Sequence, residues 1–134
     1  MDDNKIILII DDDERVVKML IRRLKRMKFS IHTAVNGKLG FEKALILQPD
    51  LVLLDIQMPI MDGYTTIVKL REVGYTGLVV ACTASVRAQD TKKAIEKGCD
   101  YFIAKPIDRD FEETIQKLLN KNIEELRDEQ SKSK

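Results

Sequence analysis

The chain alternates between short apolar runs and longer segments with the periodicity of a helix. Each apolar run is followed by a turn and then by an amphipathic segment. Three of the runs are nearly unbroken aliphatic stretches, which is typical of strands buried on both faces of a parallel sheet. The predicted strands are Ile6–Ile10, Ile31–Val35, Leu51–Leu54, Leu78–Cys82 and Tyr101–Ala104.

The intervening segments carry apolar residues at three- and four-residue spacings, as amphipathic helices do. In the first segment these are Val16, Val17, Leu20, Ile21, Leu24 and Met27, and in the last they are Phe111, Ile115, Leu118 and Leu119. Gly37 opens the second helical segment and Pro49 follows its end. Strands that alternate with helices indicate right-handed βαβ units. We therefore predict an α/β fold, a flavodoxin-like doubly wound (βα)5 domain with a parallel five-stranded sheet in the order 2-1-3-4-5.

A length of 134 residues, 44% of them hydrophobic and 34% charged, fits one globular domain. We assign residues 1–122 to this domain. Residues 123–134 are expected to form a C-terminal helix extension, with Ile123 and Leu126 on it, and a disordered tail.

Charge and hydropathy exclude several partners. The net charge of +1 argues against a nucleic-acid-binding surface, which needs a clustered excess of Lys and Arg. The basic run between Arg22 and Lys28 is interpreted as the solvated face of a helix. No apolar run approaches the roughly 20 residues that span a membrane, and the acidic start lacks the features of a signal peptide. Cys82 and Cys99 are expected to be free thiols in a cytoplasmic protein.

Polar residues follow four of the five predicted strands. Asp11 and Asp12 follow the first strand, Asp55 the third, Thr83 the fourth and Lys105 the fifth. Ligands of open parallel sheets bind beyond the carboxyl ends of the strands, so these side chains should share one site. Taken singly, each has an ordinary explanation, such as a turn, a helix cap or a solvated charge. Their joint presence favours a functional site.

Three close carboxylates repel one another and raise at least one pKa unless a cation is present. A hard divalent ion removes that conflict, and Mg²⁺ is the natural choice where phosphate oxygens complete the coordination, with Mn²⁺ as a possible substitute. Such an ion, together with a Lys and a Thr, suits a transferring phosphoryl group, and a carboxylate can accept it as a nucleophile. Asp13 is expected to cap the first helix rather than to bind metal.

At these residues the sequence resembles the receiver domains of response regulators. The run Ile6–Glu14 resembles their first strand and acidic pair, and Asp50–Gly63 resembles their phosphoacceptor segment, especially in receivers associated with hybrid histidine kinases. Leu78–Ala84 and Lys105-Pro106 match the remaining motifs. The resemblance extends from about Lys5 to Asn120.

The resemblance implies a role for each matching residue. Asp55 would be the phosphoacceptor, and Mg²⁺ would be held by Asp11, Asp12, Asp55 and the main-chain carbonyl of Gln57. Thr83, Ala84 and Lys105 would contact the phosphoryl group, Phe102 would be the aromatic switch residue, and the Lys105–Pro106 peptide would be cis. We expect the Lys105 ammonium to face solvent, so that its removal would impair phosphoryl contacts more than folding.

The same resemblance implies partners. A histidine kinase or a histidine phosphotransfer protein would donate the phosphoryl group, and an unknown output partner would bind the face made by the fourth helix, fifth strand and fifth helix. The chain would be a signalling domain that catalyses only its own phosphotransfer and dephosphorylation. It would be a monomer or a weak dimer, without nucleic-acid or membrane binding.

Two other functions are carried as alternatives. A phosphatase of the haloacid dehalogenase type would use Asp11 as its nucleophile, since Asp11-Asp12-Asp13 also fits an Asp-x-Asp motif. That interpretation leaves Asp55 and the residues after it unexplained. A pseudo-receiver would bind partners without phosphorylation, although the intact set of site residues argues against it. His32, the only histidine, is interpreted as structural.

Overall fold

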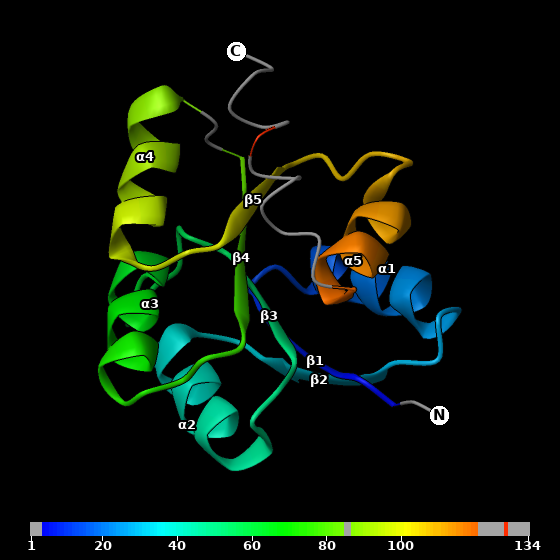
Figure 1. The fold of residues 1–134 in the computed structure, drawn as a ribbon, viewed down its shortest axis with the longest axis horizontal. Coiled ribbons are helices and arrows are strands. Elements are labelled where there is room, and N and C mark those ends of the chain that lie inside the picture. Colours follow the sequence, from blue (N-terminus) through cyan, green and yellow to red (C-terminus); the bar gives the residue numbers. More distant parts are fainter. Residues whose placement is uncertain (1–3, 85–86, 121–127, 129–134) are drawn as a thin grey trace.

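We describe a computed structural model of the chain, which covers residues 4–84, 87–120 and 128. Its centre is a parallel sheet in the strand order β2-β1-β3-β4-β5, as predicted. The strands are β1 (Ile6–Ile10), β2 (Ser30–Ala34), β3 (Leu51–Leu54), β4 (Leu78–Thr83) and β5 (Tyr101–Ala104). Figure 1 shows the sheet between two layers of helices.

The two helical layers differ in size. On one side lie α1 (Glu14–Lys25) and α5 (Phe111–Leu119), and on the other lie α2 (Gly37–Leu47), α3 (Gly63–Glu72) and α4 (Ala88–Lys97) (Figure 1). The predicted apolar stripe of α1 is confirmed, because Leu20 and Leu24 are buried and the other stripe residues pack around them. None of the helices in the described ranges is long and apolar enough to cross a membrane.

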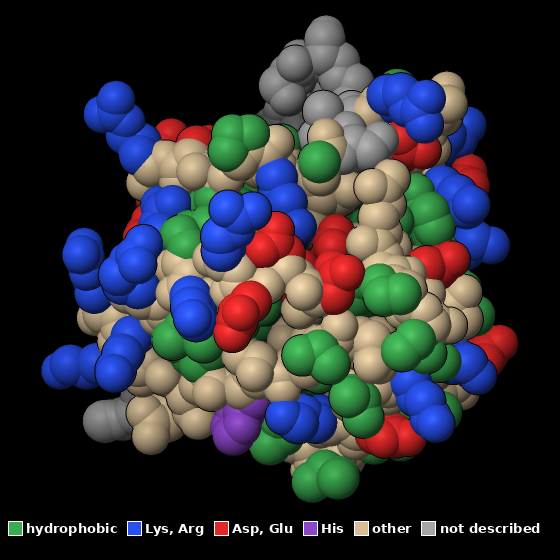
Figure 2. All heavy atoms as spheres, turned by 180° about the vertical axis from the view of Figure 1, so that it is seen from behind, with side chains coloured by type: hydrophobic (Ala, Val, Ile, Leu, Met, Phe, Trp, Pro, Cys, Tyr) green, Lys and Arg blue, Asp and Glu red, His purple; other side chains and the backbone are tan. Residues whose placement is uncertain are grey.

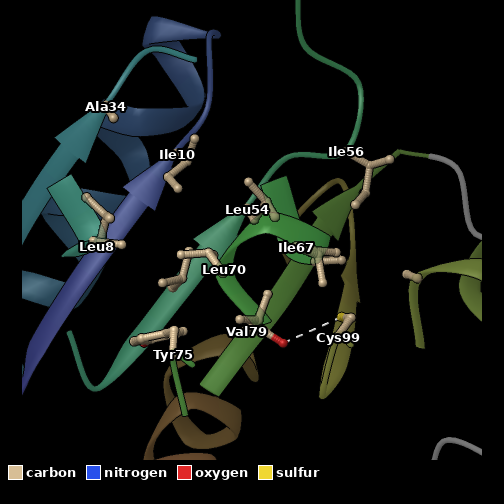
Figure 3. Close-up of a cluster of buried hydrophobic side chains, with 14 of the residues drawn as sticks. Leu8, Ile10, Ala34, Leu54, Ile56, Ile67, Leu70, Tyr75, Val79 and Cys99 are labelled. Carbon is tan, nitrogen blue, oxygen red and sulfur yellow. Dashed lines mark hydrogen bonds between the residues drawn. The ribbon is translucent and has the colours of Figure 1, made fainter. Parts of the chain in front are cut away.

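Each sheet face has its own hydrophobic core, because successive strand residues point to opposite faces. Leu8 and Ile10 pack with residues of α3 in the cluster drawn in Figure 3. Ile7 and Ile9 pack on the other face with α1 and α5. β1, β3 and β4 are buried almost throughout, as their unbroken aliphatic sequences predicted.

Two strands differ from the prediction in their bounds. β2 runs from Ser30 to Ala34, one residue earlier than expected, and Val35 is 61% exposed. β4 extends through Thr83, which pairs with Ala104. α5 ends at Leu119, with Asn120 as its C-cap residue. The expected extension at Ile123 and Leu126 lies outside the described residues, and the domain boundary at residue 122 stays a prediction.

Side-chain caps fix the starts of the helices that follow the first three strands. Asp13 accepts a hydrogen bond from the Arg15 N–H at 3.0 Å and caps α1, as the sequence predicted. Asn36 caps α2 through the Leu39 N–H at 2.8 Å, and Asp62 caps α3. Each cap satisfies a backbone donor that the helix itself leaves unpaired. The loops beyond the strands therefore have defined conformations.

Candidate functional site

The site forms where the central strands end. The backbone N–H of Asp11 donates to the Ala34 carbonyl at 3.1 Å, and that of Asp55 donates to the Ile10 carbonyl at 2.9 Å. The N–H of Lys105 donates to the Thr83 carbonyl at 2.9 Å. Sheet hydrogen bonding thus continues to the first residue after β1, β3 and β5, which places their side chains along one edge.

The three carboxylates expected to share the site do lie together. One oxygen atom each from Asp11, Asp12 and Asp55 lies within 4.8 Å of the others. Asp11 and Asp55 are buried, at 3% and 7% exposure, whereas Asp12 is exposed. In Figure 2 acidic side chains gather near the middle of the face that contains this edge. The group therefore opens to solvent on the Asp12 side.

A close backbone approach shapes the loop after Asp55. The Gly63 N–H donates to the Ile56 carbonyl at 2.8 Å. A Cβ atom at position 63 would lie 2.7 Å from the Asp55 carbonyl oxygen and 2.6 Å from the Ile56 Cα, so only glycine fits without a backbone shift. The first turn of α3 therefore packs directly on the loop that carries Asp55.

Burial and repulsion disturb the ionisation of Asp55. The pKa of its carboxyl group is raised to about 6, first by desolvation and then by the neighbouring Asp11 carboxylate, against the lowering effect of Lys105. The sequence predicted a raised pKa from like-charge repulsion, but burial is the larger cause here. The Gln57 N–H lies 3.4 Å from Asp55 Oδ1 and gives the charged form weak support.

The expectation that the Lys105 ammonium faces solvent is wrong. The ammonium lies 3.0 Å from Asp11 Oδ2 and 3.6 Å from Asp55 Oδ1, and the Lys105 side chain is 18% exposed. Burial, the largest single effect, opposes the charged form, but the hydrogen bond to Asp11 and the charges of both carboxylates raise the pKa of Lys105 overall. Asp11 also accepts from the Asp13 N–H at 2.9 Å. Lys105 thus links the two buried carboxylates.

Three of the remaining predicted residues line a cavity that the loop after Asp55 borders. The cavity has a volume of about 400 Å³, and Gln57, Thr83 and Phe102 are among its lining residues. Thr83 is buried at the end of β4, whereas Ala84 is exposed. Phe102 is half-buried on β5, opposite Ala81. The Lys105–Pro106 peptide is cis.

Other residues of this cavity were not singled out from the sequence. Arg87 and Asp90, at the start of α4, line it and form an ion pair of 2.9 Å. Tyr64 lines it from α3, and its hydroxyl group donates to the Asp90 carbonyl at 3.4 Å. Their positions depend on how α3 and α4 pack together, and no local sequence pattern reports that packing.

The chemistry of the site follows from its donor set. Its ligand atoms are carboxylate oxygens, which suit Mg²⁺ and other hard divalent cations. Asp11 and Asp55 share the single ammonium of Lys105, and the pKa of Asp55 is still raised, which is a situation that such a cation relieves. Asp11, Asp12 and Asp55 therefore fit a bound Mg²⁺. The Asp55 carboxylate, in its ionised form, could also attack an electrophilic phosphorus atom.

Comparison with known proteins identifies relatives along most of the chain. A family model described as the response regulator receiver domain matches residues 7–119. The transcriptional regulatory protein SrrA of Staphylococcus aureus is 37% identical over 100 residues, which are 75% of this chain and 41% of that protein. The chain thus spans about two fifths of the length of such curated relatives.

Three solved structures show the same fold. A CheY-like receiver domain from Methanospirillum hungatei JF-1 aligns with a TM-score of 0.83 and 25% identity, covering 91% of this chain and 98% of that one. A two-component response regulator from Clostridium difficile aligns with a TM-score of 0.82 and 28% identity, covering 90% and 98%. A chain of the CheX–CheY–BeF3–Mg²⁺ complex from Borrelia burgdorferi aligns with a TM-score of 0.78 and 32% identity, and the alignment covers 87% of this chain and 87% of that one.

Proposed function

Given that this chain belongs to the response regulator receiver domain family, we propose that it accepts a phosphoryl group on Asp55 from a phosphorylated histidine of a kinase or a histidine phosphotransfer protein. The observation that carries the proposal is the cluster of Asp11, Asp12 and Asp55 oxygens within 4.8 Å, with the Lys105 ammonium 3.6 Å from Asp55. Family membership sets aside the phosphatase alternative with Asp11 as nucleophile.

In this proposal the Asp55 carboxylate attacks the phosphorus atom of the donor. An O–P bond forms as the P–N bond to the imidazole breaks, and the imidazole nitrogen keeps the electron pair. Asp55 reacts in its ionised form, and Lys105 favours that form from 3.6 Å. The ammonium of Lys105 and the hydroxyl of Thr83 bind phosphoryl oxygens, and Ala84 adjoins Thr83 at the exposed rim.

We assign the metal site to Asp11, Asp12, Asp55 and the main-chain carbonyl of Gln57. Mg²⁺, or Mn²⁺ in its place, supplies positive charge that neutralises phosphoryl oxygens when bound. The Asp13 side chain is not a ligand of this site, because it is engaged in the cap of α1.

Phosphorylation would be transmitted through the cavity that Thr83 and Phe102 both line. Movement of Thr83 toward the phosphoryl group leaves space for the Phe102 ring, and the α4-β5-α5 face changes its affinity for an output partner. An output partner that prefers the phosphorylated form then favours phosphorylation by the same factor. The chemistry of the domain is limited to its own phosphorylation and dephosphorylation. Its cytoplasmic location and its monomeric or weakly dimeric state stay predictions.

Labelling with phosphoramidate, a small P–N donor, tests this function without a partner protein. The wild-type chain should gain one phosphoryl group in the presence of Mg²⁺ and none after chelation. Asp55→Asn should abolish labelling, because an amide cannot act as the nucleophile. Asp13→Asn should be labelled like the wild type, because Asn caps a helix as well as Asp. A wild-type chain that stays unlabelled would favour the pseudo-receiver alternative.

A further inference from the structure

Three large exposed hydrophobic residues follow the carboxyl ends of β2 and β3, at the same edge of the sheet as the acidic group. They are Val35, Leu39 and Ile60, with exposed fractions of 61%, 43% and 79%; we call them the apolar patch. Val35 is the first residue after β2. Its neighbour Ala34 accepts a hydrogen bond from the Asp11 N–H, so Val35 lies close to Asp11 in the chain fold. The loop that holds Ile60 touches the start of α2, since a Cβ at Gly37 would lie 2.4 Å from the Met61 carbonyl oxygen. The patch therefore borders the opening through which the site of Asp11, Asp12 and Asp55 meets solvent; we call this opening the mouth.

The two sides of the mouth differ in character. In Figure 2 hydrophobic side chains lie on one side of the acidic group, toward α2 and α3, and Lys and Arg side chains predominate on the other, toward α1. The exposed residues at the start of α1 are Glu14, Arg15 and Lys18, and Glu14 pairs with Lys18 at 3.8 Å. Apolar contact with a protein covering the mouth is therefore available on the α2 side.

Ile60 is an unusual residue for its conformation. Its φ angle is +74°, in the left-handed region that β-branched residues avoid. Its side chain gains little from burial within the domain, because 79% of it is exposed. Asn or Gly would adopt this backbone more readily. Folding therefore does not account for isoleucine here, and strained exposed residues of this kind are found at functional sites.

A protein that delivers a phosphoryl group must cover this part of the surface. The Asp55 side chain is only 10% exposed, so a donor histidine has to come directly over the mouth. A typical interface covers about 800 Å² on each partner, equivalent to a disc of about 16 Å radius. Val35 and Asp55 follow strands that lie two strand spacings apart, about 10 Å, so the edge that carries the apolar patch is within the reach of such a disc.

We propose that the phosphohistidine-bearing donor protein docks across the mouth with an apolar surface seated on Val35, Leu39 and Ile60. This inference rests on the proposed function and names the surface by which its partner is recognised. Continuity with the phosphoryl site identifies the occupant as the donor, because a protein bound there closes access to Asp55.

Phosphotransfer kinetics with two kinds of donor test the proposal. A panel of purified histidine kinases and histidine phosphotransfer proteins, phosphorylated on histidine, is screened with the wild-type chain, and the fastest protein is kept as the probe. Phosphoramidate serves as the second donor, because it needs no docking surface. Ile60→Asn should reduce kcat/KM for the protein donor about tenfold, as loss of an interface anchor does. Labelling by phosphoramidate should be unchanged.

Ile46→Gln is the matched control. Ile46 is 82% exposed on α2, about 13 Å along the helix axis from Gly37 at 1.5 Å per residue, at the end away from the mouth. This variant should transfer at the wild-type rate from both donors. Leu39→Gln, in the first turn of α2, should slow transfer from the protein donor as Ile60→Asn does, but by a smaller factor. Thermal unfolding of Ile60→Asn should occur at or above the wild-type temperature, because the strain is relieved.

Equal transfer from the protein donor to wild type and Ile60→Asn would overturn the docking inference while leaving the proposed function intact. The docking inference also fails if no protein donor transfers although phosphoramidate labels the chain. It fails as well if Ile60→Asn abolishes self-association in sedimentation experiments without slowing transfer, since the patch would then bind a second copy of this chain. Failure of phosphoramidate to label the wild type would instead contradict the proposed function itself.

Discussion

Asp55 has a carboxyl group whose pKa lies at about 6, chiefly because it is buried. In an unfolded chain the same group titrates near 3.9. The folded protein therefore binds the extra proton between about pH 4 and pH 6, and the free energy of unfolding falls as the pH rises through that window. Above about pH 6, ionised Asp55 destabilises the metal-free protein by on the order of 3 kcal/mol, from about two pKa units.

Asp55→Asn should therefore stabilise the metal-free protein in a pH-dependent way. The gain should be largest above about pH 6 and vanish near pH 4, where Asp55 is protonated in both states. Urea unfolding with a chelator present, repeated across this range, measures the difference. Asp110→Asn removes an exposed carboxylate at the start of α5 and serves as the control. A stabilisation independent of pH would show that Asp55 is not held with a raised pKa.

Residue types at the site were predictable, whereas their environments were not. Asp11, Asp55 and Lys105 follow predicted strands, so the sequence placed them at one edge of the sheet. It carried no information on the depth of the Lys105 ammonium, which the structure buries between two carboxylates. The left-handed backbone of Ile60 was also missed, because isoleucine ordinarily indicates an extended or helical conformation.

At the scale of elements, the aliphatic runs predicted β1, β3 and β4 well because both faces of these strands are buried. For the edge strand β2, the sequence predicted bounds one residue later than those in the structure. Val35 looks like a strand residue by composition, but the chain leaves the sheet after Ala34 to reach the Asn36 cap of α2. Exposed apolar residues outside a sheet cannot be told from buried ones by hydropathy alone.

Arg71 joins elements that no local pattern connects. From α3 its guanidinium donates to the carbonyls of Gly98, Tyr75 and Gly77, at 2.8–3.0 Å, and binds Asp100 at 2.8 Å. Asp100 in turn accepts from the Val79 N–H at 2.9 Å. A single side chain thus ties α3 to the loops before β4 and β5.

Arg71→Met keeps much of the aliphatic stem and removes every one of these donors. It should lower the free energy of unfolding by about 2–4 kcal/mol, because half-buried carbonyls and the Asp100 carboxylate lose their partner. Lys69→Met, at an exposed position of the same helix, should change stability by no more than about 0.5 kcal/mol. Chemical denaturation compares the two variants. Equal midpoints for both would mean that the Arg71 network contributes nothing measurable.

In the whole molecule, the alternation of strands and helices predicted a parallel sheet with right-handed crossovers. The order 2-1-3-4-5 was chosen as one of the common orders of such sheets, and the structure has it. That topology brings the ends of β1 and β3 together in the centre of the sheet, which sets the carboxylate cluster. The packing of α4 against α3, and with it the cavity beside Thr83, depends on side-chain contacts distant in sequence. For this reason the cavity was not predictable.

Mg²⁺ should stabilise the entire domain, because its site requires residues from two strands to be in their folded positions. A concentration ten times the dissociation constant should raise the free energy of unfolding by about 1.4 kcal/mol. The melting temperature in calorimetry should rise with Mg²⁺, and Asp12→Asn should lose most of the rise. K⁺ at matched ionic strength controls for screening of charge. A melting temperature indifferent to millimolar Mg²⁺ would contradict the shared carboxylate site.

Locating the modified carboxylate tests whether Asp55 is the phosphoacceptor. After phosphoramidate labelling with Mg²⁺, borohydride reduces the acyl phosphate to a stable alcohol, and mass spectrometry of peptides locates it. We predict that the reduced residue is at position 55, with Asp11 and Asp12 unmodified and with no label in Asp55→Asn. Reduction at Asp11, or undiminished label in Asp55→Asn, would contradict the assignment of Asp55 and return the phosphatase alternative to consideration.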